Sequence, residues 1–200
     1  MYLGEGTDDD AMVLQVANAL NDLRSGANQQ GYSFRTIAKD EFFVQMATCE
    51  FFNVITHGGI PNGMELTNEW IYTTDFTMYN SSALSNLKFA CILVCNNGEG
   101  GENADNIVNS VYSKGAQCVL GFKRIIFAPA ANYWNEHLVT YLTLGYSIDQ
   151  SIANADSDLR NSTGTGVKYT ILGEEDWNPN TDADTHPKYL VGDSSIVLFQ

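Results

Sequence analysis

Two residues of the sequence, His57 and Cys95, have side chains that together can perform nucleophilic catalysis. A cysteine–histidine pair can form a thiolate and an imidazolium, and the thiolate is a nucleophile near neutral pH. The imidazolium can then donate a proton to a leaving amine. His57 directly follows the apolar run 51–56, and Cys95 ends the apolar run 89–95. The sequence therefore predicts two buried strands, each ending in a candidate catalytic residue.

Glycines beside these residues leave room for a substrate carbonyl. Gly58 and Gly59 follow His57 and, having no Cβ, allow the backbone to approach a substrate closely. The N–H groups of Gly58 and Cys95, if adjacent, would form an oxyanion hole. We therefore expect His57 and Cys95 to be catalytic, and Gly58 and Cys95 to supply the oxyanion-binding amides.

The elements that must position these residues alternate along the chain. Apolar residues at helical spacing predict helices over residues 7–25, 40–49, 103–113, 130–144 and 147–159, the last opened by the capping box Ser147–Gln150. Strands are predicted over residues 1–4, 32–38, 51–56, 69–76 (a strand or hairpin), 89–95, 117–127, 168–172 and 194–198. This alternation favours an α/β fold whose mostly parallel sheet is covered on both faces. Reacting groups collect at the carboxyl ends of such strands.

Length, composition and charge narrow the class of protein. The 200 residues are 44% hydrophobic and 17% charged, which is typical of one folded domain, taken here as residues 1–200. The net charge of −14 disfavours nucleic acid and anionic membranes as partners. No apolar run is long enough to cross a bilayer, and the first residues do not resemble a signal peptide.

The four cysteines are expected to be free thiols. Cys91 and Cys95 would lie about 13 Å apart along one strand, which is too far for a disulfide. Free thiols suit a reducing compartment, so we expect a cytoplasmic location. Cys49, Cys91 and Cys118 are interpreted as core residues. The histidines other than His57 are assigned no role: His137 on a helix surface and His186 in an acidic loop.

The blocks around His57 and Cys95 resemble those of the caspase-like (clan CD) cysteine peptidases. Residues 51–59, Phe-Phe-Asn-Val-Ile-Thr-His-Gly-Gly, look like the family's strand followed by His-Gly. Residues 89–98 look like the family's second block, a strand that ends in the nucleophile. Their Cys-Asn-x-Gly ending is similar to that of the CHAT branch, so the sequence most resembles the CHAT and clostripain-like branch. Residues 114–122 and 144–153 resemble later steps of the same branch, so the resemblance covers about residues 50–156.

This resemblance implies a three-layer α/β/α sandwich with a mostly parallel caspase-like sheet. It also implies an endopeptidase that hydrolyses peptide bonds of a protein or peptide substrate with a Cys-His dyad, without a cofactor or metal. The family's Trp-Pro pair is replaced here by residues 123–127, Lys-Arg-Ile-Ile-Phe. That segment often shapes the substrate pocket, which makes Phe122, Lys123 and Arg124 candidate pocket residues.

Two other functions stay open at this stage. A catalytically silent caspase-like domain could serve as a regulatory or protein-binding module. A flavodoxin-like domain could bind a nucleotide, but residues 98–101, Gly-Glu-Gly-Gly, lack the phosphate-binding spacing, and Glu99 would repel a phosphate. Residues 176–187 imitate a calcium loop, yet Thr181 and Pro187 replace its glycine and its final glutamate, so we expect a solvated loop. The sequence does not define the substrate or the oligomeric state.

Overall fold

The computed structural model describes residues 2–3, 38–66, 69–164, 168–173 and 187–199. Its centre is a five-stranded sheet in the order β1-β2-β5-β6-β7. The first four strands are parallel, and β7 is antiparallel to β6. Their bounds are Tyr2–Leu3 for β1, Phe51–Ile55 for β2, Phe89–Leu93 for β5, Cys118–Phe122 for β6 and Lys188–Gly192 for β7.

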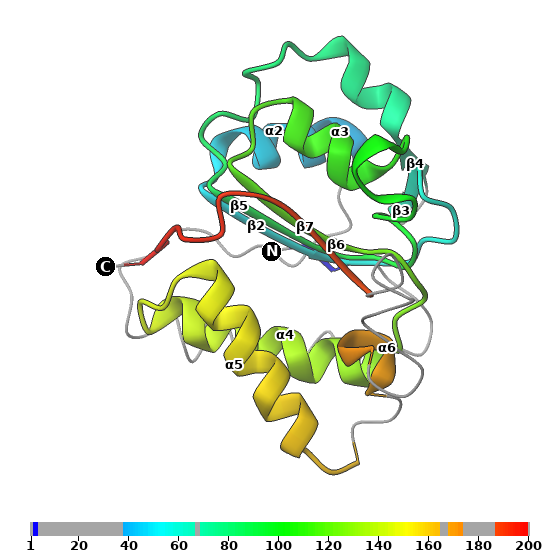
Figure 1. Ribbon diagram of the computed structural model, residues 1–200. Coiled ribbons are helices and arrows are strands. Elements are labelled where there is room, and N and C mark those ends of the chain that lie inside the picture. The colour runs from blue at the N-terminus through cyan, green and yellow to red at the C-terminus, as the bar shows by residue number, and fades with distance from the viewer. Residues whose placement is uncertain (1, 4–37, 67–68, 165–167, 174–186, 200) are drawn as a thin grey trace.

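Helices cover both faces of this sheet (Figure 1). On one face lie α2 (Lys39–Thr48) and α3 (Ile107–Ser113). On the other lie α4 (Ala128–Thr143), α5 (Ile148–Asn161) and the short α6 (Tyr169–Leu172). The expected three-layer α/β/α sandwich with a mostly parallel sheet is therefore confirmed. No helix within the described ranges is long and apolar enough to cross a lipid bilayer.

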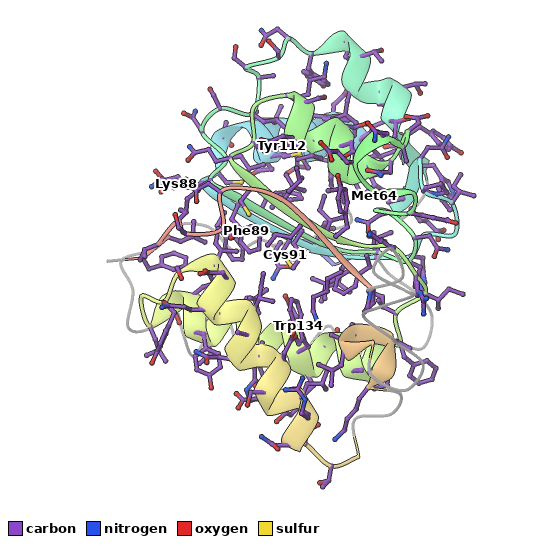
Figure 2. All side chains as sticks on the ribbon, in the orientation of Figure 1. Met64, Lys88, Phe89, Cys91, Tyr112 and Trp134 are labelled. Carbon is purple, nitrogen blue, oxygen red and sulfur yellow. The ribbon has the colours of Figure 1, made fainter. Side chains whose placement is uncertain are left out.

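The central strands are apolar at every position because both of their faces are buried. All five residues of β5 and of β6 are buried. Ala90 and Ile92 pack in the core beneath α2 and α3, whereas Phe89 and Cys91 pack on the other side with Trp134 of α4 (Figure 2). An unbroken apolar run is what a parallel strand inside a three-layer fold requires.

A small antiparallel hairpin lies beyond the carboxyl end of β2. It consists of β3 (Gly63–Leu66) and β4 (Glu69–Tyr72), and the 3-10 helix η1 (Thr73–Met78) follows it. A second 3-10 helix, η2 (Gly101–Asn103), precedes α3. The segment expected as a strand or hairpin over residues 69–76 is thus one hairpin strand followed by a helical turn.

Several predicted boundaries were wrong. The strand expected over 117–127 ends at Phe122, and the helix expected from residue 103 begins at Ile107. Residues 168–172 were predicted as a strand, but α6 forms there because Ile171 and Leu172 both bury in one core, which adjacent strand residues cannot do.

The last sheet strand was also misplaced. The last strand of the sheet is β7, not residues 194–198. Residues 194–198 instead accept hydrogen bonds from the first turn of α5: the Ile148 N–H donates to Ile196 O, and the Asp149 N–H donates to Ser194 O. The expected helix over 7–25 lies outside the described residues, as do most of the strand over 32–38 and of the calcium-like loop.

Candidate active site

The sheet register brings the segments that carry His57 and Cys95 to the same edge of the sheet. Ile55 of β2 is paired with Leu93 of β5, and each candidate residue lies two positions further along its own chain segment. The Thr56 N–H donates to the Leu93 carbonyl at 3.3 Å, which continues the pairing beyond the last strand residues. Because β2 and β5 are neighbouring parallel strands, about 4.8 Å apart, both residues follow strands that end at the same edge of the sheet.

Gly58 packs directly on the segment that carries Cys95. A Cβ atom at position 58 would lie 2.3 Å from Val94 Cγ1 and 3.0 Å from the Cys95 carbonyl oxygen. Real Cβ contacts are not this short, so only glycine fits here without a shift of the neighbouring chain. The close approach joins the loop after His57 to the loop that holds the sulfur.

The two amides expected to bind an oxyanion differ from their neighbours in hydrogen bonding. The Asn96 N–H donates to Arg124 O at 3.2 Å, and the Gly98 N–H to Phe122 O at 2.9 Å. Within the part of the chain that the structure describes, the Gly58 and Cys95 N–H groups donate to no protein acceptor. Among the described residues both N–H groups are therefore left without a protein acceptor, as the expected oxyanion hole requires.

The half-buried Cys95 sulfur contacts the segment that follows β6. The Ile126 N–H lies 3.5 Å from Cys95 Sγ and donates to it, and the Ile126 carbonyl oxygen lies 3.7 Å from the sulfur. The His57 side chain is exposed at the sheet edge. Sequence reasoning missed Ile126, since its contact is made by main-chain atoms that any residue type would supply.

A buried amide, that of Asn97, fixes the turn after Cys95. Asn97 Nδ2 donates to Ile92 O at 3.1 Å, and its Oδ1 accepts from the Phe122 N–H at 2.7 Å. A Cβ at Gly121 would lie 2.8 Å from Asn97 Oδ1, so this glycine leaves the space that the amide fills. Asn96 adopts a positive φ of 61°, a conformation that asparagine tolerates better than most residues.

The hairpin is attached to the histidine segment by its main chain. The Glu65 N–H donates to His57 O at 2.9 Å, and Thr56 Oγ1 donates to Glu65 O at 2.7 Å. These two bonds hold β3 beside the His57 segment.

The residues expected to line a substrate pocket occupy different environments. Phe122 is fully buried, with its ring centroid 6.1 Å from that of Trp134, so its side chain belongs to the core and cannot line an open pocket. Lys123 Nζ lies 5.7 Å from the Tyr189 ring centroid. Arg124 is exposed, and its carbonyl binds the Asn96 amide beside the nucleophile.

The remaining histidine and cysteines described by the structure lie away from this edge. His137 on α4 pairs with Asp158 of α5 at 2.6 Å. Cys91 and Cys118 are fully buried, and Cys49 is packed against the core beneath α2. Burial raises the pKa of Cys118 to about 12 and that of Cys49 to about 11. These thiols are core groups, as expected.

Comparison with known proteins supports the fold. No family model and no curated protein matches the sequence. Among solved structures, gingipain R, an Arg-specific cysteine proteinase, matches with a TM-score of 0.60 at 12% identity, over 98% of this chain and 47% of the other. Separase from Saccharomyces cerevisiae, in complex with securin, matches with a TM-score of 0.62 at 10% identity, over 96% of this chain and 11% of the other.

The chain thus spans about half of gingipain R and about a tenth of separase. At these identities the likeness shows the fold alone, and that is the caspase-like fold of both neighbours. It does not distinguish the CHAT or clostripain-like branch within that fold.

Proposed function

We propose that the chain is a cysteine endopeptidase in which Cys95 is the nucleophile and His57 the proton-transfer group. The observation that carries the proposal is the pairing of the two segments. Ile55 and Leu93 are in register, and Gly58 packs against the Cys95 carbonyl. A histidine and a half-buried thiol thereby share one sheet edge, where catalytic groups of α/β proteins collect.

The reaction follows from the groups at this edge. The Cys95 thiolate attacks the scissile carbonyl carbon, and the developing oxyanion accepts hydrogen bonds from the Gly58 and Cys95 amides. The C–N bond then breaks, and the His57 imidazolium donates its proton to the leaving amine. Water attacks the resulting thioester while His57 accepts a proton from it. The C–S bond breaks, which releases the acid and restores Cys95.

The chemistry needs only groups that this chain supplies. Hydrolysis of a peptide bond changes no oxidation state, so the steps above require no redox cofactor. The hydrogen bonds to the oxyanion are worth roughly 10²–10³-fold in rate for each donor, and the proton transfer is worth roughly 10²–10⁴-fold. A catalytically silent domain would lack both effects, which makes the two functions separable by activity.

The test is digestion of a proteome-derived peptide library, with the cut bonds identified by mass spectrometry. We expect Cys95→Ala to lower cleavage by roughly 10³-fold or more, because alanine has no nucleophile. His57→Ala should lower it by roughly 10²–10⁴-fold. The matched control is Cys49→Ala, which removes a thiol packed away from the site and should keep the wild-type rate.

Folding must be checked for each variant. Cys95→Ala is a small volume change at a half-buried position, and we expect the free energy of unfolding to change by about 1 kcal/mol. Full activity in the Cys95→Ala variant would refute the assignment. A folded wild-type chain that binds peptides without cutting any would favour the silent binding module instead.

A further inference from the structure

An exposed apolar surface lies on the hairpin beside His57. Gly63 is paired with Tyr72, and Glu65 is paired with Trp70, so these four residues share the outer face of the hairpin. On the opposite face, Met64 and Ile71 are fully buried in the core beneath α2 and α3. The outer face is thus a distinct surface with its own side chains.

Three apolar side chains surround Gly63 on this outer face. A Cβ added to Gly63 would lie 3.2 Å from each of Ile60 Cδ1, Trp70 Cε3 and Tyr72 Cδ1. The Trp70 and Tyr72 rings are stacked, with centroids 6.2 Å apart and planes 20° apart. Ile60 is 43% exposed and Tyr72 39%. We call Ile60, Gly63, Trp70 and Tyr72 the hairpin platform; its three apolar side chains close over the buried glycine and form one continuous apolar surface.

The platform is continuous with the candidate active site. Ile60 is the third residue after His57, and the position of a Gly58 Cβ lies 3.4 Å from the Gly63 carbonyl oxygen. The Glu65 N–H bonds to the His57 carbonyl. A peptide lying across Gly58 and Cys95 would therefore extend over the platform at one end and over the segment after β6 at the other.

The chemistry of the dyad assigns the platform to one half of that peptide. His57 protonates the leaving amine, so the residues beside His57 adjoin the part of the substrate that follows the cut bond. We propose that the hairpin platform binds an apolar side chain of the substrate's leaving-group half. This inference rests on the proposed function and adds the substrate class to it.

The charges around the platform favour an apolar occupant over an acidic one. Glu69 Oε1 accepts from the Lys39 N–H at 2.6 Å, and Asp75 Oδ2 is paired with Lys39 Nζ at 2.6 Å. Both carboxylates are thus already bound by Lys39. Glu65 lies on the platform's own face and repels an acidic substrate side chain there.

Alignment of the library cleavages on the cut bond tests this subsite. We expect leucine, isoleucine, phenylalanine and methionine to be enriched at the first positions after the cut, and aspartate and glutamate to be depleted. Trp70→Ala removes one ring of the platform, and Gly63→Ala forces its three side chains apart with a methyl group. Each should reduce the apolar enrichment at least threefold without changing the preference before the cut.

Tyr112→Ala is the matched control. It removes an aromatic side chain that is 42% exposed on α3, outside the platform and the candidate active site, so the variant should keep the wild-type pattern. If Trp70→Ala does not fold, as judged by thermal unfolding, Gly63→Ala and Tyr72→Ala supply the readout.

The outcomes separate the subsite from the peptidase itself. Cys95-dependent cuts without apolar enrichment, or an enrichment that Trp70→Ala and Gly63→Ala leave intact, would overturn the subsite and leave the peptidase standing. Enrichment of arginine or lysine after the cut would also overturn it, since Glu65 would then govern the position. Absence of any Cys95-dependent cut overturns the proposed function and this inference together.

Discussion

Cys95 differs from the other cysteines in its surroundings. Burial raises the pKa of Cys91 well above its ordinary value, and it raises the pKa values of Cys118 and Cys49 to about 12 and about 11. Only the thiolate reacts with an alkylating agent, and at neutral pH these core thiols are almost entirely protonated. Cys95 instead lies half-buried at the sheet edge, where its sulfur accepts the Ile126 N–H.

We predict that Cys95 is the first cysteine alkylated in the native protein near neutral pH. Brief treatment with limiting iodoacetamide, followed by peptide mass spectrometry, measures the order. In urea all four cysteines should label at similar rates, because unfolding removes the burial. Dominant labelling of Cys49 or Cys118 in the folded chain would contradict the assignment of Cys95 as the reactive thiol.

The raised pKa values of Cys49 and Cys118 also make the free energy of unfolding depend on pH in the alkaline range. A thiol with a pKa of about 11 or 12 when folded, against 9.0 when exposed, keeps its proton in the folded chain after the unfolded chain has lost it. The free energy of unfolding is therefore unaffected by these thiols below about pH 9 and falls as the pH rises from there toward their folded pKa values.

The turn between β5 and α3 depends on one buried side chain that binds two strands. Asn97 binds the Ile92 carbonyl and the Phe122 N–H, and it is fully buried. Replacing it with leucine keeps the size but leaves a backbone acceptor and a backbone donor unpaired. We predict that Asn97→Leu lowers the free energy of unfolding by roughly 1–3 kcal/mol. Peptidase activity should fall as well, because the turn positions the Cys95 amide.

Urea unfolding and library cleavage, measured on the same preparations, check this prediction. Gly121→Ala should have a similar effect, since its methyl group would lie 2.8 Å from Asn97 Oδ1 and 2.3 Å from Val108 Cγ2. Asn103→Leu is the control, because Asn103 is exposed in η2. Wild-type stability in the Asn97→Leu variant would show that the two hydrogen bonds contribute nothing to the turn.

Elements with a strong local pattern were predictable, and those made by tertiary contacts were not. The apolar run ending in Cys95 predicted β5, and Ser147 with Gln150 predicted the capping box of α5. In contrast, α6 forms because Ile171 and Leu172 bury together, and β7 forms by pairing with β6. The residue types of the candidate site were visible in the sequence, but the adjacency of Gly58 and Cys95 needed the register of β2 on β5.

The charge of the whole molecule acts differently from the residues at the site. A net charge of −14 attracts cationic peptides over a distance of about 30 Å at roughly 0.01 M ionic strength, and added salt screens this attraction. The segment after β6 exposes two apolar side chains beside Arg124: Ile125 is 67% exposed and Phe127 47%. Long-range attraction should therefore affect the rate at which a peptide meets the protein, whereas the side chains beside Cys95 should determine which bond is cut.

The residue preference on the acyl side of the cut bond tests whether local side chains, rather than the net charge, determine which bond is cut. Leu93, two residues before Cys95, is buried in the core and has no charge that could neutralise a basic substrate side chain. Lys123 lies over the Tyr189 ring, and the exposed Arg124 would repel a basic side chain near it. We predict no strong preference for arginine or lysine before the cut, although gingipain R shares the fold.

Library digests at low and high salt measure the two effects at once. Peptides with distant lysines should be cut several-fold faster at low ionic strength than at about 0.5 M salt, with the cut bonds unchanged. Glutamate-rich peptides of equal length provide the control, since their cleavage should become faster with salt. Cuts that fall mostly after arginine or lysine at both salt concentrations would require an acidic group from elsewhere in the chain to line the acyl-side pocket, and Leu93 would then be a misleading guide to specificity.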